Sequence, residues 1–136
     1  MLKKNWVYHR GDIYYADLNP VCGSEQGGTR PVVVIQNNTG NTYSTTLVVA
    51  TTTSKIGRKK TLPTHYPVMD NPAFGEPSIV MLEQIRTIDK ERVQSYLGKI
   101  APKDMLGIDR ALLVSLSLER FKGAVRKYIV KEGETT

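Results

Sequence analysis

The hydrophobic positions in the first hundred residues fall into short runs rather than into helical stripes. The runs are rich in β-branched and aromatic residues, and turn-forming residues separate them, which is typical of strands. Four runs are strong, one is short, and one is a weak edge candidate interrupted by proline. We therefore predict strands at 13–18, 31–36, 47–53, 65–69, 78–86 and 93–100. Such short strands indicate a small barrel or a strongly bent sheet.

Helical periodicity begins only after Pro102, which suits the first turn of a helix, and it continues to Phe121. Two apolar stripes run along this segment. One stripe serves to cover the helix's own sheet. The second predicts a further cover, for which a second copy of the chain is the simplest source and flanking residues of the same chain are the alternative. Beyond the helix we expect one domain at 1–122 and a frayed polar tail at 123–136.

The composition is that of one soluble domain, with 136 residues, 40% of them hydrophobic and 24% charged. A single cysteine cannot form an internal disulfide, so a reduced, cytoplasmic setting is expected. The basic pair Lys3-Lys4 has no apolar segment after it, which argues against a signal peptide. No apolar run approaches the roughly 20 residues of a membrane span.

Positive charge is concentrated in the first half of the chain. The net charge is +6, and residues 1–68 carry +5 of it. Four of these cations lie within six residues: Lys55, Arg58, Lys59 and Lys60. A basic surface attracts polyanions such as nucleic acids. For a short basic run taken alone, a solvated loop without a partner is the commoner case.

A twelve-residue loop at 19–30 separates the first two predicted strands and contains three glycines. Glycines such as Gly27 and Gly28 let a backbone approach a ligand closely. Arg30 ends the loop, and Pro31 after it favours an extended backbone for that arginine. An arginine held in this way beside a flexible turn is suited to binding a phosphate.

The next two predicted strands, 31–36 and 47–53, are joined by a loop short enough for antiparallel pairing. Such pairing would bring Arg30 and Thr53 to the same end of the sheet. A guanidinium, a hydroxyl and the loop's backbone N–H groups could together hold a phosphodiester and stabilise charge in a transition state. Two plainer readings stand beside this one. Arg30 could be a surface ion-pair partner of Glu25, and the threonines at 51–53 could reflect strand propensity alone.

Other chemistries lack a pattern in this sequence. The two histidines, His9 and His65, are far apart, and no paired-histidine, paired-cysteine or P-loop motif occurs. Cys22 has no motif that would make it a nucleophile. We therefore expect no metal site and no cofactor.

Four separated motifs fall in an order that resembles the PemK/MazF toxin family. They lie at 10–18, 23–37, 62–65 and 82–89, and the likeness runs from about Arg10 to Phe121. This resemblance implies a mainly β fold, an SH3-like barrel with a C-terminal helix, that forms a homodimer. It also implies the toxin of a type II toxin–antitoxin pair, a metal-independent endoribonuclease that cuts single-stranded mRNA. Attack by the RNA's own 2′-hydroxyl would leave 2′,3′-cyclic phosphate and 5′-hydroxyl ends.

The same resemblance implies Arg30 and Thr53 as the catalytic residues. The residues expected to bind substrate are Ser24, Glu25, Gln26, Gly27, Gly28, Lys55, Arg58, Lys59, His65 and Gln84. The expected partners are single-stranded RNA and a cognate antitoxin with an acidic, disordered C-terminal segment. Cys22, Thr29 and the length of 57–61 depart from the family pattern, which leaves the recognised bases open.

Two functions of other classes remain possible on the same barrel. One is a non-catalytic poison that binds a protein target such as a topoisomerase. The other is an RNA-binding module without activity. The presence of both Arg30 and Thr53 favours the ribonuclease, because a binding module has no need of that pair.

Overall fold

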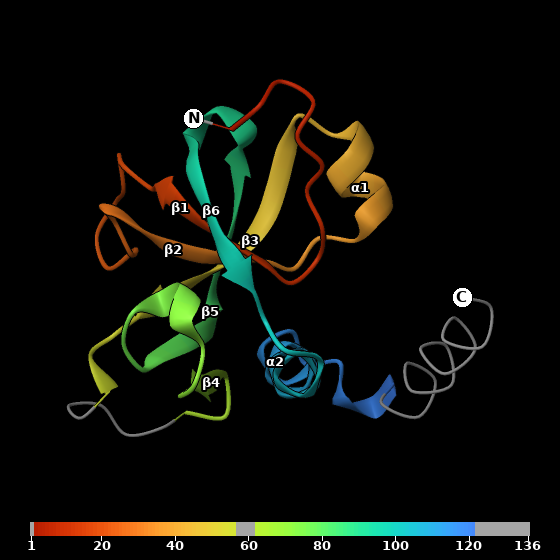
Figure 1. Cartoon of the computed structure of the whole chain (residues 1–136). Coiled ribbons are helices and arrows are strands. Elements are labelled where there is room, and N and C mark those ends of the chain that lie inside the picture. Colours follow the sequence, from red (N-terminus) through yellow and green to blue (C-terminus); the bar gives the residue numbers. More distant parts are fainter. Residues whose placement is uncertain (1, 57–61, 122–136) are drawn as a thin grey trace.

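The computed structural model describes residues 2–56 and 62–121. Within them, six strands form one antiparallel sheet in the order β4-β5-β3-β2-β1-β6, which wraps strongly around itself (Figure 1). The strands are β1 (Asp12–Asp17), β2 (Thr29–Val34), β3 (Thr46–Thr53), β4 (His65–Val68), β5 (Ser78–Asp89) and β6 (Val93–Lys99). Helix α1 (Asn38–Tyr43) lies between β2 and β3, and α2 (Pro102–Ser115) follows β6. The predicted mainly β class and all six predicted strands are confirmed.

Both faces of the sheet are buried, which explains why the central strands read as continuous apolar runs. Neighbouring residues of a strand point to opposite faces. Ile13 and Val33 therefore enter one core, which α2 completes with Ile108. Tyr14 and Val32 enter a second core on the other side of the same strands. The two cores therefore pack on both faces of the sheet and fix the positions of its strand ends.

Polar contacts fix α2 against the rest of the domain. The Tyr66 hydroxyl of β4 donates to Asp104 Oδ1 at 2.6 Å, and Arg10 Nη2 pairs with Asp109 Oδ1 at 2.7 Å. Gly107 faces the Tyr66 ring so closely that a Cβ there would lie 1.9 Å from the ring's Cε1. The helix therefore seats at one depth, set by the aromatic ring.

Apart from shifts of one or two residues at strand ends, the structure differs from the prediction in three places. Helix α1 was not predicted; it forms because the Asn37 side chain caps it, accepting from the Gly40 N–H at 2.8 Å. Strand β5 runs three residues beyond 86, past a bulge that faces the step between Ala50 and Thr51. The prediction that the C-terminal helix reaches residue 121 is wrong. The helix ends at Ser115, and Ser117 with φ 59° breaks it.

Candidate functional site

The Arg30 side chain is fixed by two backbone carbonyls. Its Nε donates to Gly27 O at 2.8 Å and its Nη1 donates to Thr52 O at 3.1 Å. The first contact ties the guanidinium to the glycine loop and the second ties it to β3. Within residues 2–56 and 62–121, Nη2 donates to no protein group. One edge of the guanidinium is thus used for positioning, and the remaining nitrogen is left for a ligand.

Arg30 and Thr53 lie at the same end of the sheet, as the sequence predicts. The β2–β3 ladder pairs Val32 with Thr51, and Arg30 Nη1 donates to the Thr52 carbonyl, which brings Arg30 beside the end of β3. Both residues line one cavity of about 250 Å³. The residues that line it are Arg30, Pro31, Thr52, Thr53, Ser54, Lys55, Phe74, Glu76 and Ser78. Two cations and one carboxylate thus face a cavity whose size suits a small polar group.

The glycine loop is held by its own polar contacts. The Gly28 N–H donates to Asn19 Oδ1 at 3.0 Å, and Gly28 adopts φ 75°, which favours glycine. A Cβ on Gly27 would lie 2.9 Å from Asn19 Oδ1 and from Val21 Cγ2. The two glycines are therefore required by the loop's shape. The Gly28 N–H was predicted to donate to a phosphate, but it already donates to Asn19 within the loop.

Glu25 does not pair with Arg30. Its Oε1 accepts from the Cys22 N–H at 2.5 Å, which closes the tip of the loop. Among the described residues Arg30 forms no ion pair with any carboxylate. The ion-pair reading of this arginine is therefore wrong.

Of the remaining predicted residues in the described part of the chain, only one lines the cavity. Lys55 lines it and is exposed, whereas Ser24 is exposed on the loop away from the cavity lining. The Gln26 amide contacts Met81 Sδ at 3.9 Å, so the loop reaches β5. Gln84 accepts from the Thr51 hydroxyl at 3.1 Å through its backbone carbonyl, not its side chain. The predicted Arg58 and Lys59, with Lys60, lie outside the described residues.

His65 is buried and paired rather than exposed at the cavity. Its Nε2 lies 2.7 Å from Glu83 Oε2, and the Thr64 hydroxyl donates to the other oxygen of Glu83 at 3.1 Å. Only 3% of the His65 side chain is exposed, and its Nδ1 is buried with no hydrogen-bond partner among the described residues. The structure therefore does not bring His65 together with Arg30 and Thr53, and Glu83 is a neighbour that the sequence reading did not single out.

Six lining residues were not among the predicted site residues: Pro31, Thr52, Ser54, Phe74, Glu76 and Ser78. Phe74 and Glu76 belong to the connection from β4 to β5, where Asn71 caps a short 3₁₀ helix at Pro72–Phe74 and Gly75 turns the chain with φ 73°. The proline and glycine indicate a turn but not where the turn folds. Among the described lining residues Glu76 is the only carboxylate, and its charge is opposite to that of Arg30 and Lys55.

Among the described residues, no group of three histidine, cysteine, aspartate or glutamate side chains gathers to hold a metal ion. In the same part of the chain no helix has the length and apolar character needed to cross a membrane.

Comparisons with known proteins point to one family. The family model for PemK-like, MazF-like toxins of type II toxin–antitoxin systems matches residues 9–116. The endoribonuclease MazF of Staphylococcus epidermidis is 49% identical over 116 residues, which cover 85% of this chain and 96% of that protein.

Solved structures give the same picture. A mycobacterial endoribonuclease in complex with its cognate antitoxin aligns at TM-score 0.67 and 28% identity, over 82% of this chain and 97% of that chain. MazF from Deinococcus radiodurans aligns at TM-score 0.71 and 22% identity, over 83% of this chain and 99% of that chain, and shows the shared fold.

Proposed function

This chain belongs to the PemK-like, MazF-like toxins of type II toxin–antitoxin systems, and on that premise we propose that it is an endoribonuclease acting at the Arg30 cavity. It cleaves single-stranded mRNA at short sequences and needs no metal ion, since RNA supplies its own nucleophile. The observation that carries the proposal is the fixed Arg30 guanidinium beside Thr53, with one nitrogen free.

Arg30 binds the scissile phosphate and stabilises the charge that develops on it. Because a guanidinium is a permanent cation at neutral pH, Arg30 supplies charge and hydrogen-bond donors and does not act as a base. Its Nε and Nη1 already contact carbonyls, so little side-chain freedom is lost when Nη2 meets a phosphate oxygen. In such a site, fixed hydrogen-bond donors directed at the developing charge supply most of the transition-state stabilisation.

Thr53 positions the phosphate or the attacking hydroxyl. Its Oγ1 accepts from the Lys55 N–H at 3.3 Å, which leaves the hydroxyl hydrogen free to donate. A donor at this point, across from Arg30, would hold a second phosphate oxygen. The two residues together fix the orientation of the phosphodiester.

Glu76 is the base of the proposed reaction. It takes the proton of the 2′-hydroxyl while the 2′-oxygen forms a bond to phosphorus and the bond from phosphorus to the 5′-oxygen breaks. The 5′-oxygen takes a proton from the Lys55 ammonium, giving a 2′,3′-cyclic phosphate and a 5′-hydroxyl. Both side chains line the Arg30 cavity, and no other lining side chain is a carboxylate.

The surroundings of the cavity support an extended RNA substrate. Arg58 and Lys59 would hold flanking phosphates, which makes binding salt-dependent. Ser24 and Gln84, on the loop and on β5, would contact substrate bases. The bases that the site selects depend on these segments.

The partners follow from the family and from exposed apolar surface. A cognate antitoxin with an acidic, disordered C-terminal segment suits a chain of net charge +6. Leu106 and Leu116 on and after α2 are 53% and 47% exposed, which supports a homodimer that covers them. We place the pair in the cytoplasm.

The test is cleavage of a single-stranded RNA in the presence of chelator, with the new ends sequenced and their phosphates assigned. We expect the wild type to leave cyclic phosphate and 5′-hydroxyl ends. Arg30→Ala should lower the rate about 10²- to 10³-fold, the usual cost of losing one such donor. Arg110→Ala, on the exposed surface of α2, is the matched control and should cleave normally. Intact RNA with wild-type protein, or equal rates for Arg30→Ala, would overturn the assignment.

A further inference from the structure

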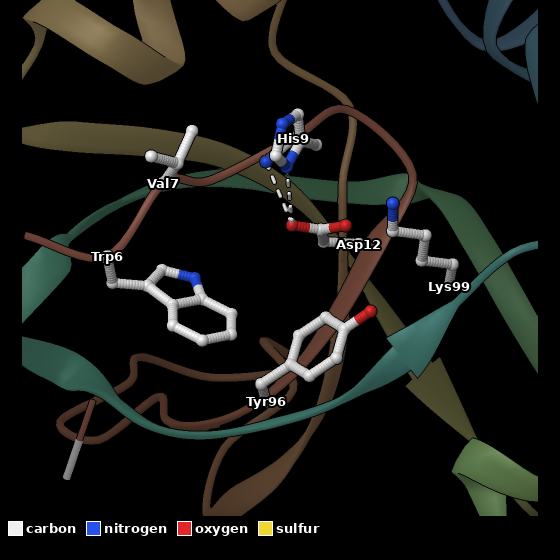
Figure 2. Close-up of a pocket in the computed structure, with 6 residues that line it drawn as sticks. All are labelled: Trp6, Val7, His9, Asp12, Tyr96 and Lys99. Atoms are coloured by element: carbon white, nitrogen blue, oxygen red, sulfur yellow. Dashed lines mark hydrogen bonds and ion pairs between the residues drawn. The ribbon is translucent and has the colours of Figure 1, made fainter. Parts of the chain in front are cut away.

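A second cavity, of about 320 Å³, lies between the N-terminal segment and β6. Figure 2 shows its six lining side chains around a central space: Trp6, Val7, His9, Asp12, Tyr96 and Lys99. None of them lines the Arg30 cavity. Its volume is at the lower end of small-molecule sites, which span about 300–1,000 Å³. Trp6 and Val7 also precede residue 9, where the match to the family model begins.

The cavity contains a buried carboxylate with spare bonding capacity. Asp12 is 1% exposed, and its Oδ2 accepts from the Tyr14 hydroxyl at 2.6 Å and from the His9 N–H at 2.8 Å. Its Oδ1 is buried and has no hydrogen-bond partner among the described residues. An unpaired buried acceptor is costly, so a ligand that brings an N–H donor to Oδ1 gains what the free protein lacks.

Aromatic rings form the apolar side of the cavity. Trp6 and Tyr96 lie with ring centroids 5.2 Å apart at 49°. The Trp6 indole N–H is already used, because it donates to the Tyr14 hydroxyl at 2.8 Å. The ring faces are therefore what Trp6 and Tyr96 offer a ligand, and a flat ring is the shape that stacks on them.

The rim of the cavity is basic. Lys99 is exposed there, and 52% of the His9 side chain is exposed. A cationic ligand would satisfy Asp12 but would meet Lys99 and a protein of net charge +6. A ligand that suits the cavity would have three properties. It would carry an N–H donor for Asp12, a flat ring to stack on the aromatic side chains, and an anionic group that lies at the rim near Lys99. A nucleotide has this combination.

We propose that this cavity binds an amino-bearing nucleobase, with the amino group donating to Asp12 Oδ1 and the phosphate near Lys99. Cytosine, adenine and guanine carry such a group, whereas uracil presents one N–H between two carbonyls that would face the carboxylate. The base stacks on Trp6 or Tyr96. The site goes beyond the proposed cleavage, because it does not use Arg30 or Thr53.

The test is a titration of the full chain with CMP and UMP, followed by NMR signals of the Trp6 indole and the Tyr96 amide. The two nucleotides share ring size, sugar and phosphate, and CMP has the amino group where UMP has a carbonyl. We expect CMP to shift these signals and to bind about tenfold tighter than UMP or better, the size of one charge-assisted hydrogen bond. Equal affinities, or shifts confined to Arg30 and Lys55, would overturn the proposal.

Two variants at exposed Val7 test the rim without touching the core. Val7→Glu adds a negative charge beside the phosphate and should weaken CMP binding several-fold. Val7→Gln has nearly the same size without the charge, and it should weaken CMP binding clearly less than Val7→Glu does. Asp12→Asn should remove the preference for CMP, and because Asp12 also holds Tyr14, its melting temperature is measured alongside. Equal weakening by both Val7 variants would contradict the proposal.

The base could come from a free nucleotide or from RNA, and oligonucleotides separate the two. In an Arg30→Ala background, which preserves the RNA, rC4 and rU4 are compared by the same signals. A cytosine preference in the tetramers assigns the site to RNA, and a preference seen only with mononucleotides assigns it to a free nucleotide. Wild-type protein that binds CMP at Trp6 but leaves RNA intact would overturn the proposed function alone. Cleavage without any shift at Trp6 would overturn this site alone.

Discussion

At the scale of single residues, Arg30 shows how a charged side chain is held without a charged partner. The carbonyls of Gly27 and Thr52 orient the guanidinium but do not neutralise it, so its charge stays available to an anion. A carboxylate partner would have competed with a phosphate for the same nitrogens. Glu25, the nearest candidate in sequence, is held instead by the Cys22 N–H.

The sequence predicted Arg30 and Thr53 but not Glu76. The first two lie at strand ends, and antiparallel pairing fixes their relative position by register. Glu76 lies in the connection from β4 to β5, whose path depends on the Asn71 cap and the Gly75 turn. The pairing of His65 with Glu83 was not foreseen for a related reason, since it comes from the β4–β5 register and not from any local pattern.

The role of Glu76 predicts the effect of removing its charge. Glu76→Gln should lower kcat/KM about 10²- to 10⁴-fold near neutral pH, because an amide cannot accept the 2′-hydroxyl proton. The measurement is the cleavage rate of one short RNA. Glu91→Gln, an exposed substitution outside the cavity lining, should keep the wild-type rate. An unchanged rate in Glu76→Gln would exclude this base.

At the scale of elements, the sheet was predictable and its connections were not. Strand positions follow from apolar runs because both faces of the sheet are buried. Helix α1 depends on one side-chain cap in a polar segment that reads equally well as a turn. The end of α2 depends on the backbone of Ser117, which no periodicity signals.

The close contact between Gly107 of α2 and the Tyr66 ring predicts that a methyl group at position 107 lowers the stability of the domain. Gly107→Ala should destabilise the domain by roughly 1–3 kcal/mol, since the new Cβ collides with the Tyr66 ring. Chemical denaturation measures this free energy of unfolding. In a Tyr66→Leu background the same substitution should cost clearly less. Equal costs in both backgrounds would show that the ring does not set the helix depth.

The contact between β4 and α2 also predicts a loss of stability in alkali. The hydrogen bond to Asp104, together with burial, raises the pKa of Tyr66 from 10.0 to about 12. The neutral phenol is thus favoured by folding, so its contribution is complete below pH 10 and is lost between pH 10 and about 12. Wild type should exceed Tyr66→Phe in stability by roughly 1 kcal/mol at pH 8. That difference should vanish towards pH 12 in thermal melts, and a constant difference would contradict it.

At the scale of the whole molecule, the fold positions the cavity and the net positive charge attracts the polyanionic substrate. The sheet and α2 provide a rigid frame, whereas +5 of the net charge of +6 lies in residues 1–68, which include Arg30 and Lys55. A net positive charge favours encounter with a polyanion. The family comparison assigns the chain to a class of toxins, and the cavity chemistry explains how such a chain would cut RNA.

The most direct test of this account is cleavage of an RNA whose cut site has been mapped, with a single 2′-deoxy nucleotide placed immediately 5′ to the scissile phosphate. Attack by the 2′-hydroxyl requires that one oxygen, so we predict that the substituted RNA is bound but stays uncut in chelator, while the unmodified RNA is cut. Cleavage of the substituted RNA at the same phosphate would contradict the account.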